Sequence, residues 1–177
     1  MKKKILFITA TRADFGKLKS LIKITKKSKK FSVYIIVTGM HMMRTFGDTH
    51  TEITKFFKSN VIKFRNQRFK DNLDTILTNT VKKFSIIVKK IKPDLILIHG
   101  DRIESLGCAL VGSLNHILTA HIEGGEVSGN IDDTIRHAVT KLSHIHFVGN
   151  NKAKKRVLNM GEKRNSVFTI GSPDMDI

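Results

Sequence analysis

The chain has 177 residues, with 32 lysines and arginines against 15 aspartates and glutamates, a formal net charge of +17 and an isoelectric point of about 10.2. A domain of this length buries roughly 70% of the surface of its unfolded chain, so we expect one well-packed domain and not two. The single cysteine, Cys108, excludes an intrachain disulfide, and no segment approaches the roughly 20 apolar residues of a membrane span. These properties predict a cytoplasmic protein that has no membrane partner.

Apolar runs of strand length alternate along the chain with segments of helical periodicity. This alternation favours an α/β fold with a doubly wound, mostly parallel Rossmann-like sheet of about seven strands. Helices are expected after the loop 9–16, over 73–91 and 103–114, and after Asp132 and Asn150, while residues 40–57 predict short helices or a lid. The expected strands cover residues 5–8, 31–37, 61–64, 95–98, 117–122, 145–148 and 167–170.

Polar residues follow four of the predicted strands. Right-handed crossovers place such loops at one edge of a parallel sheet, where open α/β folds bind their ligands. Acidic groups gathered at one edge raise one another's pKa values, and this cost is expected where protons must be moved near neutral pH. The loops carry Arg12 and Asp14, then Asp101 and Arg102, then the segment from Glu123 to Asp132, and finally Ser172 and Asp174.

The third of these loops, within residues 121–137, is the most informative. Glu123 emerges at the end of the preceding strand pattern, and apolar residues recur at helical spacing from residue 135 onward. The helix is therefore predicted to begin near Asp132 or Asp133, whose carboxylate can cap its free N–H groups, and Arg136 follows Asp132 by one turn. Carboxylates beside an arginine and a helix N-terminus suit proton transfer next to a phosphate.

The histidines and the cysteine predict no metal centre. His144 and His146 share one strand face, but no third ligand has suitable spacing. Cys108 lies in an apolar helix pattern and is expected to be a small core residue. His99 and His121 flank Asp101 and Glu123, and we expect them to orient these acids.

The basic charge comes largely from lysine-rich runs at residues 26–30, 89–92 and 152–156. Such a field can attract nucleic acid. The chain has no tryptophan and one tyrosine, however, and the runs are not interleaved with aromatic residues that could stack on bases. A solvated basic surface is the favoured interpretation, and nucleic acid is not expected as a partner.

Four motifs resemble those of one enzyme family. The stretch HIEGGEVSGNIDDTIRHAVTKLSH, residues 121–144, resembles the signature of the hydrolysing UDP-N-acetylglucosamine 2-epimerases, which make N-acetylmannosamine for sialic acid synthesis, and of relatives acting on legionaminic acid precursors. TRADFGKL (11–18), HGDRIE (99–104) and GSPDMD (171–176) resemble the family's first loop, its GDR-x-E element and its G-x-P-x-x-D element. The resemblance spans nearly the whole chain, in the expected order.

The resemblance implies half of a GT-B-like enzyme, in which two Rossmann-like domains face each other across a cleft. Residues 1–177 would form the single amino-terminal domain, with the carboxyl-terminal domain absent. The implied reaction eliminates UDP across C1 and C2 of the sugar and adds water back, without a metal or redox cofactor. Asp101, Glu123 and Asp132 match the acids assigned to proton transfer; Arg12, Asp14, Arg136 and Ser172 are the implied substrate-binding residues.

The same motifs separate the hydrolysing from the non-hydrolysing subfamily and leave two alternative functions open. HIEGGE and DD-x-x-RH differ from the HVEAGLR-like and PEE-x-NR elements of non-hydrolysing 2-epimerases, so the hydrolysing class is favoured. The expected partners are UDP-N-acetylglucosamine or a related nucleotide sugar and further copies of the chain. Two alternatives stay open: an inactive remnant or a split-enzyme subunit that needs a separately encoded second domain, and a basic nucleic-acid-binding Rossmann-like module.

Overall fold

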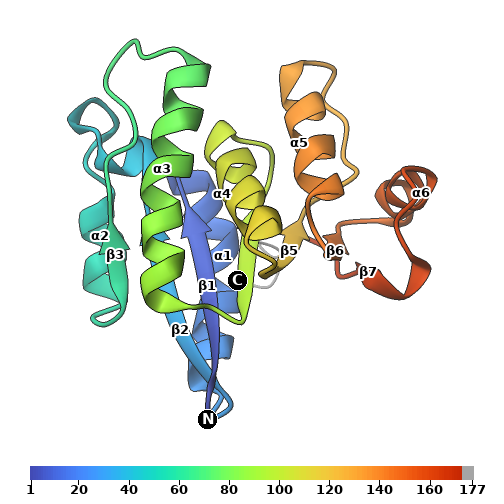
Figure 1. The fold of residues 1–177 in the computed structure, drawn as a ribbon, viewed down its shortest axis with the longest axis horizontal. Coiled ribbons are helices and arrows are strands. Elements are labelled where there is room, and N and C mark those ends of the chain that lie inside the picture. The colour runs from blue at the N-terminus through green and yellow to red at the C-terminus, as the bar shows by residue number, and fades with distance from the viewer. Residues whose placement is uncertain (173–177) are drawn as a thin grey trace.

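The computed structural model describes residues 1–172, and these form one seven-stranded parallel sheet (Figure 1). The strand order is β3-β2-β1-β4-β5-β6-β7, so the chain winds outward in both directions from β1 and β4. This confirms the predicted α/β class and the predicted strand number. The strands are β1 Lys3–Thr9, β2 Phe31–Val37, β3 Val61–Lys63, β4 Leu95–His99, β5 Leu118–Ile122, β6 Ile145–Val148 and β7 Val167–Thr169.

Helices cover both faces of the sheet. In Figure 1, α3 and α4 lie in front of the strands, whereas α1 lies behind them. α5 packs in the same apolar core as α3 and α4. The segment predicted as short helices or a lid contains two 3-10 helices, Gly39–Met42 and Arg44–Phe46, followed by α2. The α-helices are α1 Arg12–Lys27, α2 His50–Phe56, α3 Leu73–Ile91, α4 Ile103–Leu114, α5 Ile131–Lys141 and α6 Asn151–Asn159.

Alternate residues of the central strands enter two separate apolar cores. Leu6 of β1 packs with the α3 and α4 residues Phe84 and Cys108, whereas Phe7 packs on the opposite side with Leu18 of α1. Because helices bury both faces, a polar side chain has no solvated position in the middle of β1, which explains its uninterrupted apolar sequence. Cys108 is fully buried, as the sequence predicts.

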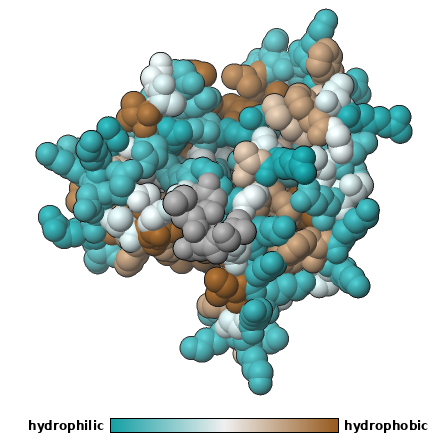
Figure 2. All heavy atoms as spheres, turned by 180° about the vertical axis from the view of Figure 1, so that it is seen from behind, coloured by the Kyte–Doolittle hydropathy of each residue, from teal (hydrophilic) through white to brown (hydrophobic). Residues whose placement is uncertain are grey.

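The surface on one side of the molecule is largely polar. Figure 2, which shows the molecule from behind, has hydrophilic side chains over most of its area, with small apolar patches between them. Among residues 1–172, no helix is long and apolar enough to cross a membrane.

The start of α5 differs from the prediction. The helix begins at Ile131, and the side chain of Asn130, not that of Asp132 or Asp133, caps it by accepting a hydrogen bond from the Asp132 N–H at 2.9 Å. Asparagine is as good an N-cap as aspartate, and capping two residues earlier releases both carboxylates for other contacts. Asp133 uses its carboxylate to fold the preceding loop, accepting N–H groups from Ser128 and Gly129, each at 2.7 Å.

One buried histidine ties three elements together. His121 of β5 lies with Nε2 2.8 Å from the Gly100 carbonyl oxygen, after β4, and with Nδ1 3.1 Å from the Thr140 hydroxyl of α5. Because a carbonyl oxygen only accepts, Nε2 carries the proton and Nδ1 accepts from Thr140. Burial lowers the pKa of His121 to about 3, so the ring is neutral at pH 7.

Two glycines in helices should respond oppositely to alanine. At Gly16 of α1 an added Cβ meets no atom within 4 Å, so Gly16→Ala should raise the free energy of unfolding by about 0.5–1 kcal/mol through helix propensity. At Gly112 of α4 the Cβ would lie 2.5 Å from the Thr119 hydroxyl and 3.2 Å from Ile96, and Gly112→Ala should lower it by roughly 1–3 kcal/mol. Urea unfolding measures the free energy of unfolding of each variant. Equal changes in the two variants would contradict the packing described.

Acid should destabilise the fold in part through His121. Its pKa in the folded chain, about 3, is below the ordinary 6.5, so between these values the unfolded chain binds a proton that the folded chain does not. The free energy of unfolding should therefore fall as the pH falls from about 6.5 toward 3, with a contribution of up to roughly 1.4 kcal/mol per pH unit. Urea unfolding between pH 4 and 7 should give His121→Gln a shallower pH dependence than the exposed-site control His116→Gln; identical slopes would refute this origin.

Candidate active site

Three loops that carry acidic residues leave the sheet at the same edge. β1 pairs in parallel with β4, and β4 pairs in parallel with β5, so their carboxyl ends lie side by side. The residues that follow these ends are the N-terminus of α1 with Asp14, the segment from His99 to Asp101, and Glu123. The predicted convergence of the acidic loops is therefore a feature of the fold.

His99 lies between two of these acids. Its Nδ1 is 3.5 Å from Oδ1 of Asp14, and its Nε2 is 3.1 Å from Oε2 of Glu123, although neither contact has the alignment of a hydrogen bond. The histidine side chain is only 6% exposed. Asp14 is itself fixed by the capping box of α1, in which its Oδ2 accepts the N–H groups of Ala10 and Thr11. The imidazole thus joins the first turn of α1 to the end of β5.

Glu123 also binds a lysine. Nζ of Lys17, one turn after Asp14 on α1, lies 2.8 Å from both carboxylate oxygens of Glu123, and the Ser172 hydroxyl lies 3.4 Å from Oε1. The backbone of Glu123 is left-handed, with φ of 63°, a conformation that costs a residue other than glycine free energy. A strained backbone at a site-bearing position is typical of functional residues.

The contacts fix the charge of this group at neutral pH. Burial alone would raise the pKa of Glu123, but His99 and Lys17 outweigh burial and lower it to about 2. Burial alone would lower the pKa of His99, but Asp14 and Glu123 raise it above its ordinary value. Burial also acts to raise the pKa of Asp14, and His99 with the N–H of Ala10 holds it below its ordinary value. The acids are therefore ionised.

A second group of charges lies beside the first, around Arg136 of α5. Its Nη2 binds Oδ2 of Asp101, two residues after His99, and its Nη1 lies 3.1 Å from Oδ1 of Asp133. The arginine is 9% exposed, so this is a partly buried ion pair and not a surface contact. Arg136 thus joins the loop after β4 to the first turn of α5.

The remaining predicted residues have looser surroundings. Arg12 is exposed on the first turn of α1 and lies 3.7 Å from Glu52 of α2. Asp132 is half-buried, and within residues 1–172 its carboxylate has no hydrogen bond or ion pair. Ser172 contacts Glu123, as described. Asp174 and the rest of the G-x-P-x-x-D element lie outside the described residues.

Three residues of the site are absent from the predicted set of catalytic and binding residues: Lys17, His99 and Asp133. Lys17 follows Asp14 by three residues, so the two side chains lie on the same face of α1. This spacing is visible in the sequence. His99 directly precedes the Gly-Asp of the second loop and was expected only to orient its neighbours. Asp133 was expected to cap α5, but it binds Arg136 and the preceding loop.

The arrangement offers general acid and base groups next to cations. Ionised carboxylates can accept protons, and Lys17 and Arg136 can bind phosphate oxygens. Among residues 1–172, no group of three or more His, Cys, Asp or Glu side chains is placed to hold a metal ion.

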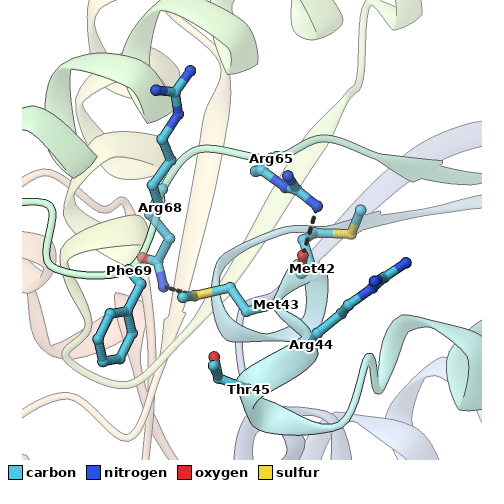
Figure 3. A pocket seen from close by; sticks show the side chains of 8 residues that line it. Met42, Met43, Arg44, Thr45, Arg65, Arg68 and Phe69 are labelled. Carbon is cyan, nitrogen blue, oxygen red and sulfur yellow. Dashed lines mark hydrogen bonds between the residues drawn. The ribbon is translucent and has the colours of Figure 1, made fainter.

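A separate cavity of about 500 Å³ lies between the 3-10 helices after β2 and the segment after β3. Figure 3 shows Arg65 reaching the Met42 carbonyl, while Arg44 and Arg68 extend away from the centre. The sulfur of Met43 accepts a hydrogen bond from Gln67 at 3.1 Å. None of the acids described above lines this cavity.

The fold is that of a solved epimerase. The crystal structure of UDP-GlcNAc 2-epimerase from Neisseria meningitidis bound to UDP-GlcNAc superposes with a TM-score of 0.87 at 21% identity, over 98% of this chain and 47% of that chain. At this identity the likeness establishes the fold.

Sequence comparison establishes the family. Residues 23–177 match the family model described as UDP-N-acetylglucosamine 2-epimerase. A Neisseria meningitidis serogroup B protein named UDP-N-acetylglucosamine 2-epimerase is 48% identical over 99% of this chain and 46% of its own length. A Campylobacter jejuni GDP/UDP-N,N'-diacetylbacillosamine 2-epimerase (hydrolyzing) is 41% identical over 97% of this chain and 45% of its own length. The chain spans about half the length of these relatives, and it belongs to the UDP-N-acetylglucosamine 2-epimerase family.

Proposed function

We propose that the chain forms half of a hydrolysing UDP-N-acetylglucosamine 2-epimerase, which converts the nucleotide sugar and water to N-acetylmannosamine and UDP. The observation that carries this proposal is the position of Glu123. Its ionised carboxylate lies at the carboxyl end of β5, bound by Lys17 and next to His99, and the Asp101–Arg136 pair lies on the adjoining loop. Acids and fixed cations at one edge match a reaction that moves protons while a phosphate departs.

The reaction assigns a part to each group. The C2 hydrogen is weakly acidic and needs a base, and the alkene carbon later needs a proton donor; Glu123, Asp101 and Asp132 supply these functions. Arg136 stabilises charge on the departing phosphate, because a guanidinium matches phosphate geometry. The other substrate-binding residues are Arg12, Asp14, Ser172 and, in addition, Lys17.

Two observations favour the hydrolysing subtype over the non-hydrolysing one. The chain carries HIEGGE and DD-x-x-RH at residues 121–126 and 132–137, where non-hydrolysing enzymes carry other motifs. A relative 41% identical to this chain is itself named as hydrolysing. The first observation concerns the segment that contributes Glu123 and Arg136.

A second domain completes the cleft in this proposal. The chain covers 46% of the length of its Neisseria relative, which matches one Rossmann-like half of a GT-B-like fold. A substrate held at the edge of β4 and β5 needs contacts from the opposite side, whether these come from a continuous chain or from a separate subunit. The 177-residue chain by itself is therefore one surface of the proposed site.

The isolated 177-residue chain should release UDP from UDP-N-acetylglucosamine far more slowly than a typical enzyme. Losing one positioned catalytic group costs roughly 10²–10⁴-fold, and without the opposing domain several contacts are lost together. A coupled assay for UDP measures the rate. Turnover on the order of 1–10³ s⁻¹ by the purified chain would show that one domain suffices.

Glu123→Gln tests the proposed reaction in a chimera that joins residues 1–177 to the second half of the Neisseria relative. The amide keeps the shape of the side chain and removes its basicity, so kcat should fall roughly 10²–10⁴-fold with little change in KM. Lys90→Gln, on the exposed last turn of α3, is the control and should leave kcat unchanged. The assay follows UDP and N-acetylmannosamine together. Near-normal turnover by Glu123→Gln would assign this residue a structural role.

Arg136→Ala in the same chimera should behave differently. The substitution removes the cation that binds both Asp101 and Asp133, so it should raise KM as well as lower kcat. Steady-state kinetics with varied UDP-N-acetylglucosamine separates the two constants. An effect on kcat alone would argue against a substrate-binding role for Arg136.

A further inference from the structure

The surroundings of His99 place an anion at each of its ring nitrogens. Asp14 lies at Nδ1 and Glu123 at Nε2, at 3.5 and 3.1 Å, and the side chain is nearly inaccessible to solvent. A neutral imidazole has only one N–H, so one of the two carboxylates would lie next to a ring nitrogen that carries a lone pair. An imidazolium has two N–H groups and suits both neighbours.

The charge balance around the ring points the same way. The charged groups facing it are Asp14 from α1 and Glu123 after β5, and Lys17 from α1 neutralises Glu123 from its other side. His121 of β5 also interacts electrostatically with the ring, and it is neutral at pH 7. Two carboxylates and one lysine leave an uncompensated buried negative charge, which a second proton on His99 neutralises.

We propose that His99 is a positioning residue that stays doubly protonated at neutral pH and holds Glu123 ionised and in a fixed orientation against Asp14. The geometry gives the histidine no reacting partner of its own, because both nitrogens already face carboxylates. Asp14, fixed by the capping box of α1, serves as the anchor for the ring. His99 therefore acts through Glu123, and the value of this to catalysis rests on the proposed function.

The protonation state can be measured in the 177-residue chain, without assuming any activity. With 15N-labelled histidine, NMR should show protons on both ring nitrogens of His99 at pH 7. In Glu123→Gln the titration midpoint of His99 should fall by roughly 1–3 pH units, because an opposite charge is lost at close range. The exposed His116 is the control, and its NMR signals should be the same in both proteins. A singly protonated His99 at pH 7, or an unchanged midpoint in Glu123→Gln, would overturn the proposal.

A second measurement addresses the effect on Glu123. In the active chimera, His99→Asn should lower kcat roughly 10²-fold, as expected when a reacting group is misplaced, and should leave KM nearly unchanged. The acidic limb of the kcat profile should move to higher pH, because Glu123 loses a cation that keeps it ionised. A lower kcat with an unmoved acidic limb would mean that the histidine only supports packing. An inactive wild-type chimera would count against the proposed function, whereas the NMR result concerns His99 alone.

Discussion

Parallel pairing of β1, β4 and β5 is the constraint on which the rest of the molecule depends. Each of these strands is buried on both faces, so a charged group that must reach a ligand can appear only where a strand ends. Parallel strands end at a common edge, and the crossover helices on the two faces return the chain to the opposite edge. The charged residues Asp14, Asp101 and Glu123 are therefore neighbours in space although long segments separate them in sequence.

The acids at this edge lie in a strongly basic protein. Every acid that contacts another described residue there has a cation beside it: Glu123 has Lys17, Asp14 has His99, and Asp101 has Arg136. The net charge of +17 surrounds these pairs with a positive field that favours the approach of anions such as nucleotide sugars. Local pairing keeps the acids ionised, and the global charge attracts the proposed substrate.

The architecture was predictable from sequence, whereas the contacts within the site were only partly so. The helix expected over residues 73–91 is α3, Leu73–Ile91, because its apolar periodicity is strong. The predicted start of α5 was too late by about two residues. Asn130, Asp132 and Asp133 are all good N-cap residues, so the sequence pattern does not select among them. The pair of Lys17 and Glu123 spans 106 residues, and no local pattern encodes such a contact. A shared sheet edge predicts that these residues lie close together, but it does not predict which of them contact one another.

The left-handed backbone at Glu123 sets function against stability at one position. Gly125, two residues later, and Gly100, after the neighbouring strand, also have positive φ, and there the residue without a side chain adopts it at little cost. A glutamate adopts the same backbone only at a cost in free energy. Selection for thermal stability alone would favour glycine here, and a stabilised descendant of this protein can therefore lose its central carboxylate without losing its fold.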